Sequence, residues 1–292
     1  MSWKQISFEV KKSETDLISE VLMGLGSLSI TYSNALDDAI YEPPVGQTPL
    51  WDSVKVNALF SSEVNQKSIE ASILEICNIV VICTLELKDT VWEDECKKDF
   101  PSMRFGKKLW VCPSWDTETK FSNDSLVINM DPGLAFGTGT HQTTSLCLEY
   151  LDSNPPKNLH VIDFGCGTGV LAIAAAKLGA VSVIAIDNDP QAVLSSKENV
   201  AKNNCENIIS TIHSIDQKHD NQCDLLIANI LANPLVELEP LFSNLVYPNG
   251  LLLLSGILKE QVDRVVNCYS VNFSNIEVVN KDEWFRISAK RK

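Results

Sequence analysis

From Leu159 onward, short apolar strands alternate with helices, and no other feature of the chain restricts its fold as strongly. The strand patterns are NLHVIDFG, VSVIAID, CDLLIANI and GLLLLSG. The helical patterns between them are GVLAIAAAKLGA, PQAVLSSKENVAKNN and PLVELEPLFSNLV. Strands that are apolar over nearly their whole length are typical of a parallel sheet covered by helices on both faces. The pattern predicts a doubly wound, Rossmann-like α/β domain, which we place over residues 116–292.

A glycine-rich loop, DFGCGTG, follows the first of these strands. Open α/β sheets bind ligands at the carboxyl ends of their strands. At that place Gly165, Gly167 and Gly169 would let the backbone turn sharply and approach a ligand closely. Asp187 ends the next strand, 24 residues after Asp163, where a carboxylate can bind a pair of ribose hydroxyls. The two features together predict an adenosine-containing ligand.

The spacing of the glycines separates two kinds of adenosine cofactor. A dinucleotide fingerprint needs G-x-G-x-x-G, but Val170 stands where its third glycine would be. The loop has the spacing G-x-G-x-G instead. The ammonium of S-adenosylmethionine suits the acidic neighbour Asp163, whereas a pyrophosphate needs a helix terminus open to an anion. The loop therefore favours S-adenosylmethionine over NAD. A tight turn that binds nothing is the alternative, and Asp187 argues against it.

Asn229 ends the strand CDLLIANI and is followed by Ile230 and Leu231. Amine methyltransferases often carry an Asn or Asp followed by apolar residues at this place, near the transferable methyl group. We therefore expect Asn229 to position the substrate amine near that methyl group. Taken alone, an Asn at a strand end more often only makes a turn.

The first 90 residues have the element order β-α-β-β-α-β. Ile6, Phe8 and Val10 alternate as a half-buried strand, and Ser13, with Asp16 at the capping-box position, opens a helix. The strands SLSITYS, VKVNALF and VVICTLEL and the helix VNQKSIEASILEIC complete the unit. This is a split βαβ, ferredoxin-like arrangement. It lacks the basic and aromatic residues of an RNA-recognition sheet, so we expect a protein-binding domain.

Residues 91–115 are expected to link the two domains. The stretch VWEDECKKDFPSMRFGK has mixed charge and predicts a short helix that stops before Pro101. The segments LWVCPSW and SLVINM that follow read as extended.

Composition excludes several classes of protein. The net charge is −14, and residues 1–90 carry 6 basic and 13 acidic groups, a net charge of −7. We therefore expect no direct nucleic-acid site. The nine cysteines occur singly, so we expect no metal site. No apolar run is long enough to cross a membrane and no signal peptide opens the chain, so we expect a cytoplasmic protein. We also expect it to be a monomer.

With these residues in hand, the chain closely resembles the PrmA family, the methyltransferases of ribosomal protein L-eleven, whose catalytic domain has the class I methyltransferase fold. The resemblance covers, in order, the chain beyond about residue 90. It runs through MRFGKKLWVCPSW, MDPGLAFGTGTHQTT, VIDFGCGTGVLAIAAAKLGA, AIDNDPQAV, LLIANILANPL, LLLSGIL and EWFRI. Two residues depart from the pattern: Gln142 replaces a usual proline, and Cys96 replaces a usual tryptophan.

The resemblance implies a reaction and a partner. Methyl groups would pass from S-adenosylmethionine to lysine ε-amines, and to an α-amine, of a basic large-subunit ribosomal protein, up to trimethylation. We expect residues 1–90 to bind that protein.

The resemblance also explains why a second glycine-rich segment, FGTGTH, lies so close to the first. It implies that this loop folds over the methionine end of the cofactor. It assigns cofactor binding to Thr140, Gly165, Asp187 and Asn229, with Phe136, Asp163 and Gly167 as further candidates. His141 beside this loop is expected to be structural rather than a general base.

Two other functions remain as alternatives. A methyltransferase acting on a nucleobase would share the second domain but should have a basic surface. A binding module without activity would need a disabled cofactor site, yet Gly165, Asp187 and Asn229 are all present. An NAD oxidoreductase is disfavoured mainly by Val170.

Overall fold

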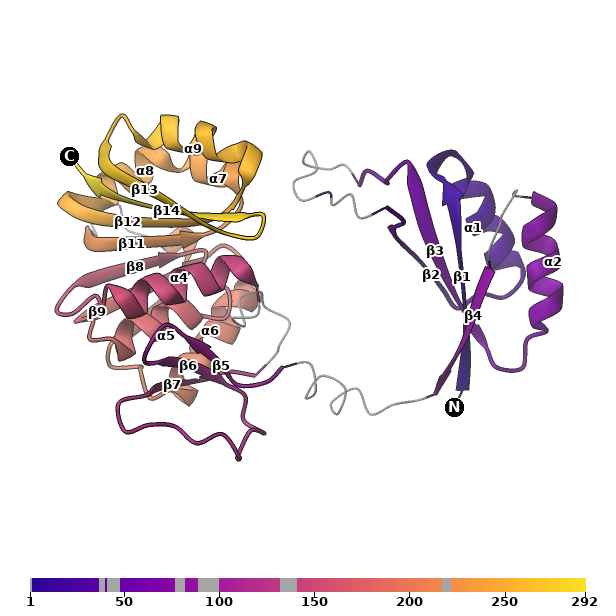
Figure 1. Ribbon diagram of the computed structural model, residues 1–292, viewed down its shortest axis with the longest axis horizontal. Coiled ribbons are helices and arrows are strands. Elements are labelled where there is room, and N and C mark those ends of the chain that lie inside the picture. The colour runs from indigo at the N-terminus through magenta and orange to yellow at the C-terminus, as the bar shows by residue number, and fades with distance from the viewer. Residues whose placement is uncertain are drawn as a thin grey trace. The chain divides into compact units, whose positions relative to one another are not determined.

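The structure, a computed structural model, describes residues 2–36, 40, 48–76, 82–88, 100–131, 141–216 and 222–292. The chain divides into two compact units, Met1–Asp94 and Glu95–Lys292, whose elements are labelled in Figure 1. The short helix expected near residues 91–100 falls almost entirely on residues outside the described ones. Among the described residues, no helix is long and apolar enough to cross a membrane.

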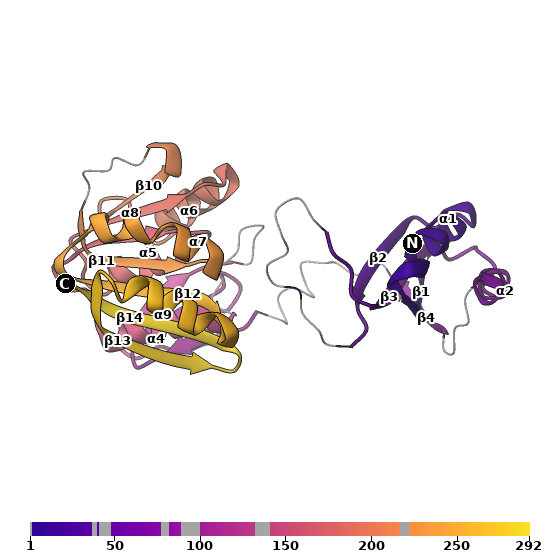
Figure 2. The same ribbon diagram turned by 90° about the horizontal axis from the view of Figure 1, so that it is seen from above.

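The first unit is one four-stranded antiparallel sheet with two helices. Its elements are β1 (Ser2–Lys11), α1 (Thr15–Gly24), β2 (Ser29–Asn34), β3 (Ser53–Ser61), α2 (Gln66–Ile76) and β4 (Ile82–Lys88). The strand order is β2-β3-β1-β4. The sequence of elements is the expected β-α-β-β-α-β, and both helices lie on the same side of the sheet (Figures 1 and 2).

Buried and exposed residues alternate along the strands, which explains why both helices cover the same face of the sheet. Inward-facing strand residues such as Ile6, Phe8 and Val56 are buried against Ile18 of α1 and Ile73 of α2 in a core of their own. A helix start was placed wrongly, however. Ser13 lies inside a 3-10 turn, Lys12–Glu14, that precedes α1. The cap there is the Glu14 carboxylate, which accepts a hydrogen bond of 2.8 Å from the Lys11 backbone N–H. Glu14, at the third position of this turn, therefore takes the capping-box role expected of Asp16.

The second unit contains a mixed seven-stranded sheet. Its strands are β8 (His160–Phe164), β9 (Ser182–Asp187), β10 (Ile209–His213), β11 (Cys223–Asn229), β12 (Val246–Leu258), β13 (Phe273–Lys281) and β14 (Trp284–Arg291). The order is β10-β9-β8-β11-β12-β14-β13. The first five are parallel. This confirms the expected parallel sheet, to which β10 adds a strand that the sequence patterns did not predict. The edge differs: β14 runs antiparallel to β12 and β13, and a turn at Asp282 (φ +53°) joins β13 and β14 into a hairpin.

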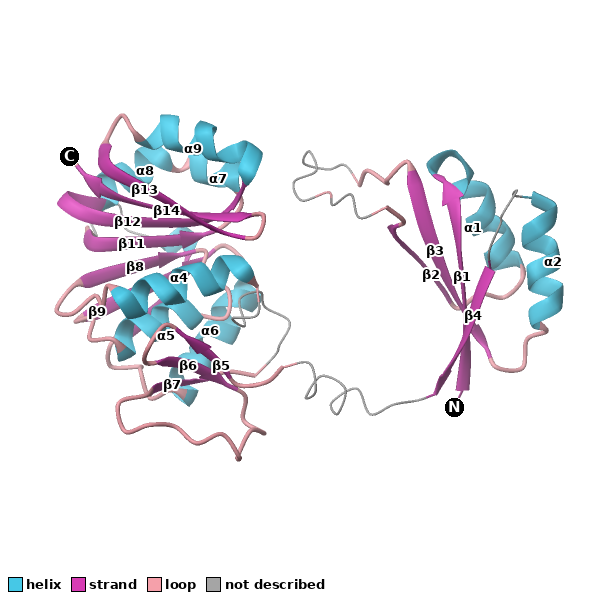
Figure 3. Cartoon of the chain, viewed as in Figure 1, coloured by secondary structure: helices cyan, strands magenta, loops and turns pink. Residues whose placement is uncertain are grey.

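Helices cover both faces of this sheet (Figure 3). They are α4 (Gln142–Ser153), α5 (Val170–Lys177), α6 (Pro190–Lys202), α7 (Ala232–Glu237), α8 (Glu239–Leu245) and α9 (Val262–Tyr269). Neighbouring strand residues point to opposite faces: Val161 joins the core with α4 and α5, and Ile162 joins the core with α7, α8 and α9. The single helix expected over PLVELEPLFSNLV is two helices, α7 and α8, because Pro240 lacks the N–H that would continue α7.

A smaller sheet packs beside α4. It contains β5 (Met103–Phe105), β6 (Leu109–Cys112) and β7 (Leu126–Asn129), in that order. The Asp152 carboxylate of α4 accepts backbone hydrogen bonds from Lys107, Lys108 and Leu109. The predicted linker, residues 91–115, overlaps this sheet: residues 103–112 form strands within the second unit, and their buried side chains, such as Phe105, join the core around α5.

Candidate functional site

The glycine-rich loop turns sharply at the carboxyl end of β8. Gly165, Gly167 and Gly169 have φ values of +75°, +53° and +80°, which L residues with side chains rarely adopt. The backbone N–H groups of Gly165 and Cys166 both donate to the Ile186 carbonyl oxygen, at 2.8 and 2.9 Å. The loop is therefore fixed to the end of β9, and the expected role of the glycines in the turn is confirmed.

Asp187 lies at the end of β9, directly beside this loop. Its Oδ2 accepts a hydrogen bond from the Gly167 N–H at 2.9 Å, and its Oδ1 accepts one from the Asp189 N–H at 3.0 Å. Each carboxylate oxygen can accept a second hydrogen bond, and the side chain is only partly buried. The arrangement leaves acceptor capacity for two hydroxyl groups of a ligand.

Asp163 lies underneath the loop, with 1% of its surface exposed. Its Oδ2 accepts a hydrogen bond of 2.9 Å from the Ala172 N–H in α5. Its Oδ1 is buried and has no hydrogen-bond partner among the described residues. Burial raises the pKa of Asp163 to about 7; the Ala172 N–H opposes this shift and the nearby Asp187 charge adds to it. The contact to α5 braces the loop, and the unpartnered oxygen is an acceptor that a ligand ammonium would satisfy.

We expect Asp163→Asn to make the ligand-free protein more stable relative to the wild type as pH rises. The folded-state pKa of Asp163 lies above its unfolded value, so the wild type loses stability as pH rises toward about 7. Asn cannot ionise and keeps an oxygen for the Ala172 N–H. Urea unfolding between pH 5 and pH 8 should show the difference in unfolding free energy growing by more than about 1 kcal/mol. A difference that stays constant over this range contradicts the prediction.

Asn229 lies at the carboxyl end of β11, the strand beside β8. Its side-chain Nδ2 donates to Thr144 Oγ1 at 3.2 Å, in the first turn of α4. Because the carboxyl ends of parallel strands meet at one edge, Gly165, Asp187 and Asn229 all lie at the same edge of the sheet. The strand order reverses between β8 and β11 there, which is where open α/β sheets bind ligands.

His141 begins α4. Its Nδ1 accepts from the Thr143 N–H at 3.4 Å, and its ring meets Trp284 edge-on with centroids 4.9 Å apart. Partial burial lowers the pKa of His141. These contacts favour the structural role expected for it. Gln142, the first residue of α4, donates a hydrogen bond of 3.3 Å to Asp282.

Some of the residues expected in the site cannot be placed. Thr140 and Phe136 in the FGTGTH loop, and Cys96 further upstream, lie outside the described residues. Conversely, Thr144 was not anticipated: a buried threonine in a short helix before the sheet carries no local signal of contact with Asn229. Within the described parts of the chain, no group of three or more His, Cys, Asp or Glu side chains could hold a metal ion.

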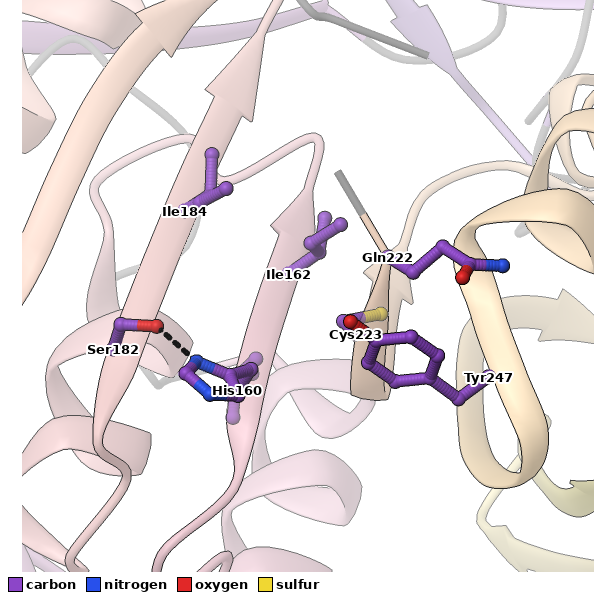
Figure 4. A pocket seen from close by; sticks show the side chains of 8 residues that line it. His160, Ile162, Ser182, Ile184, Gln222, Cys223 and Tyr247 are labelled. Atoms are coloured by element: carbon purple, nitrogen blue, oxygen red, sulfur yellow. Dashed lines mark hydrogen bonds between the residues drawn. The ribbon is translucent and has the colours of Figure 1, made fainter. Parts of the chain in front are cut away.

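A hollow of about 270 Å³ opens at the opposite edge of the sheet (Figure 4). It lies at the amino ends of β8, β9 and β11, where His160 Nδ1 and Ser182 Oγ are 2.7 Å apart. Strand polarity separates it from Gly165, Asp187 and Asn229, so it is not the site that the glycine-rich loop forms.

Comparisons with known proteins agree with this geometry. A family model described as ribosomal protein L11 methyltransferase (PrmA) matches residues 2–292. The ribosomal protein L11 methyltransferase of Pasteurella multocida (strain Pm70) is 44% identical over 295 residues, covering 99% of both chains. That of Haemophilus influenzae (strain PittEE) is 43% identical over 297 residues, covering 100% of this chain and 99% of the relative. A crystal structure of ribosomal protein L11 methylase from Lactobacillus delbrueckii subsp. bulgaricus aligns with a TM-score of 0.61 at 32% identity, covering 66% of this chain and all of that one.

Proposed function

The chain belongs to the ribosomal protein L11 methyltransferase (PrmA) family, and from this premise we propose that it transfers methyl groups from S-adenosylmethionine to ribosomal protein L11. The acceptors would be lysine ε-amines and an α-amine, each methylated up to three times. The reaction would take place in the cytoplasm with the enzyme as a monomer. The observation that carries the proposal is the glycine-rich loop with Asp187, at the edge where the strand order reverses.

The residues at this edge fit S-adenosylmethionine. The Asp187 carboxylate would accept hydrogen bonds from the ribose hydroxyls. Gly165 and Gly167 would let the backbone turn so that it approaches the cofactor, because both adopt a positive φ that glycine tolerates. The unpartnered Oδ1 of Asp163 supports a cationic ligand group nearby. Thr140, with Phe136, would act at the methionine end, as the family resemblance implies.

Bound S-adenosylmethionine supplies an electrophilic methyl group on a positively charged sulfonium. The protein must then present a neutral amine. Keeping a lysine of pKa ~10.4 neutral at pH 7 costs about 4.6 kcal/mol. An apolar surrounding lowers the pKa of an amine, and the half-buried Ile230 and the 41% exposed Leu231 follow Asn229 directly. Asn229 would hold the amine, since its amide oxygen remains able to accept a hydrogen bond while its Nδ2 donates to Thr144.

We propose that the first unit is a ferredoxin-like domain that recognises the substrate. Residues 1–90 carry a net charge of −7 and none of the cofactor-binding motifs. A basic ribosomal protein would be attracted by this charge, which mainly raises the association rate.

Incubation with ribosomal proteins and methyl-labelled S-adenosylmethionine tests the proposed reaction. We expect label in one large-subunit protein, on lysine ε-amines and an α-amine located by mass spectrometry. A parallel calorimetric titration should show binding of S-adenosylmethionine but not of NAD. Label found in ribosomal RNA would instead indicate a nucleobase methyltransferase, and binding of NAD alone would indicate an oxidoreductase.

A further inference from the structure

Ile230, the residue after Asn229, is enclosed by two glycines from different parts of the chain. A Cβ atom at Gly165 would lie 2.3 Å from Ile230 Cγ2. A Cβ atom at Gly256 would lie 2.2 Å from the Ile230 carbonyl oxygen and 2.7 Å from its carbonyl carbon. Carbon atoms pack at about 3.5–4.0 Å. Ile230 therefore occupies the space that a side chain at either glycine would need.

The two glycines touch Ile230 in different ways. Gly165 belongs to the loop after β8 and meets the Ile230 side chain, whereas Gly256 belongs to β12 and meets the Ile230 backbone. Both have a left-handed φ, +75° and +86°. Gly256 also lies where the pairing of β12 with β14 shifts register, between Ser255 and Ile257. A bulge of this kind re-aims the neighbouring backbone.

The same region fixes Asn229. Asn229 is the register partner of Ser255 in the pairing of β11 with β12, so the bulge follows directly after it. The Asn229 side chain donates to Thr144 at 3.2 Å, and the buried Ser255 hydroxyl lies 3.3 Å from the Thr143 carbonyl oxygen. Asn229 is thus held by α4 and β12, while the next residue, Ile230, touches the glycine-rich loop.

We propose that Ile230 is a positioning residue that sets the separation between the cofactor-binding loop and Asn229. Gly256 makes this possible, because only a residue without a side chain lets the β12 bulge press against the Ile230 peptide. The inference rests on the proposed function. Methyl donor and amine must approach to about 3–3.5 Å, so a small displacement of Asn229 relative to Gly165 slows transfer. Asp187, on the far side of the loop, would still hold the cofactor.

The first test is Gly256→Ala. The added methyl group must displace the Ile230 backbone, so we expect kcat to fall at least about tenfold while the Kd for S-adenosylmethionine stays close to that of the wild type. Gly250→Ala is the matched control on the same strand, because its Cβ would also be crowded, 2.7 Å from Val246 Cγ1 and 2.9 Å from the Tyr247 carbonyl oxygen. Gly250→Ala should lose thermal stability, but it should not combine a lowered kcat with an unchanged Kd for S-adenosylmethionine.

The second test is a double-mutant cycle on cofactor affinity, which needs no acceptor protein. Gly165→Ala should weaken S-adenosylmethionine binding by pushing Ile230 Cγ2 away. Ile230→Ala removes that atom and leaves a Cβ contact of 3.8 Å, an ordinary distance. The double variant should therefore bind the cofactor more tightly than Gly165→Ala alone. Ile230→Val keeps the Cγ2 methyl group that faces Gly165, so it should retain a higher kcat than Ile230→Ala.

The outcomes separate this inference from the proposed function. A wild-type protein that fails to bind S-adenosylmethionine or to methylate the ribosomal protein overturns the proposed function. A wild type that does both, together with additive effects of Gly165→Ala and Ile230→Ala on affinity, overturns the positioning role of Ile230. Full kcat in Gly256→Ala overturns it as well.

Discussion

Asp187→Ala is expected to weaken S-adenosylmethionine binding by about 10- to 150-fold, the equivalent of about 1.5–3 kcal/mol for hydrogen bonds to a charged group. The carboxylate accepts a hydrogen bond of 2.9 Å from the Gly167 N–H, and its oxygens would accept further hydrogen bonds from the ribose hydroxyls. Its removal therefore takes away both a contact to the ligand and a brace of the loop. Isothermal titration calorimetry measures the loss, and circular dichroism shows whether the variant is folded.

Asp189→Ala is the matched control for this change. Asp189 lies two residues further on and caps α6 by accepting from the Gln191 N–H at 2.9 Å. Losing this cap should lower stability by about 0.5–2 kcal/mol and leave cofactor affinity unchanged. A folded Asp187→Ala protein that binds S-adenosylmethionine as well as the wild type would remove Asp187 from the site.

The elements that the sequence predicts best are those with a strong local pattern. Nearly all residues of strand β8, helix α5 and strand β9 are buried or half-buried. These elements are therefore rich in apolar residues, and the apolar pattern is visible in the sequence. Strand β13 is different, because most of its residues after Phe273 are exposed and its strand geometry depends on pairing with β14. Helix α4 was missed as well. Its first turn is threonine-rich, and its buried positions become meaningful only once the sheet is present.

The residues of the candidate site can also be divided into those that the sequence predicts and those that it does not. Gly165 directly follows a strand, and Asp187 and Asn229 each end one. The rule that parallel strands end at one edge is enough to predict that these residues meet. Thr144 and Gly256 come from elsewhere in the chain, in α4 and β12. Their contacts with Asn229 and Ile230 arise from helix packing and from a shift in strand register. Neither follows from a local pattern of residues.

Removal of residues 1–90 is expected to leave S-adenosylmethionine binding intact, while methylation of ribosomal protein L11 falls by at least about a thousandfold. Each unit has its own hydrophobic core: residues such as Ile6 and Phe60 form one, and residues such as Val161 and Leu253 belong to another. The truncated protein should therefore fold. If the first unit recognises the substrate as proposed, its removal would leave the acceptor amine to reach the cofactor only through random encounters, and the advantage of holding the amine in place would be lost.

A short lysine peptide is the control acceptor for this deletion. Because it is too small to use a recognition domain, both forms should methylate it at the same slow rate, which shows that the second unit remains competent. With full-length enzyme and ribosomal protein L11, kcat/KM should fall as salt is raised, since the acidic charge of residues 1–90 acts mainly on association. If the truncated enzyme methylates ribosomal protein L11 at the full-length rate, the first unit does not recognise the substrate. The acceptor must then be bound by the second unit alone.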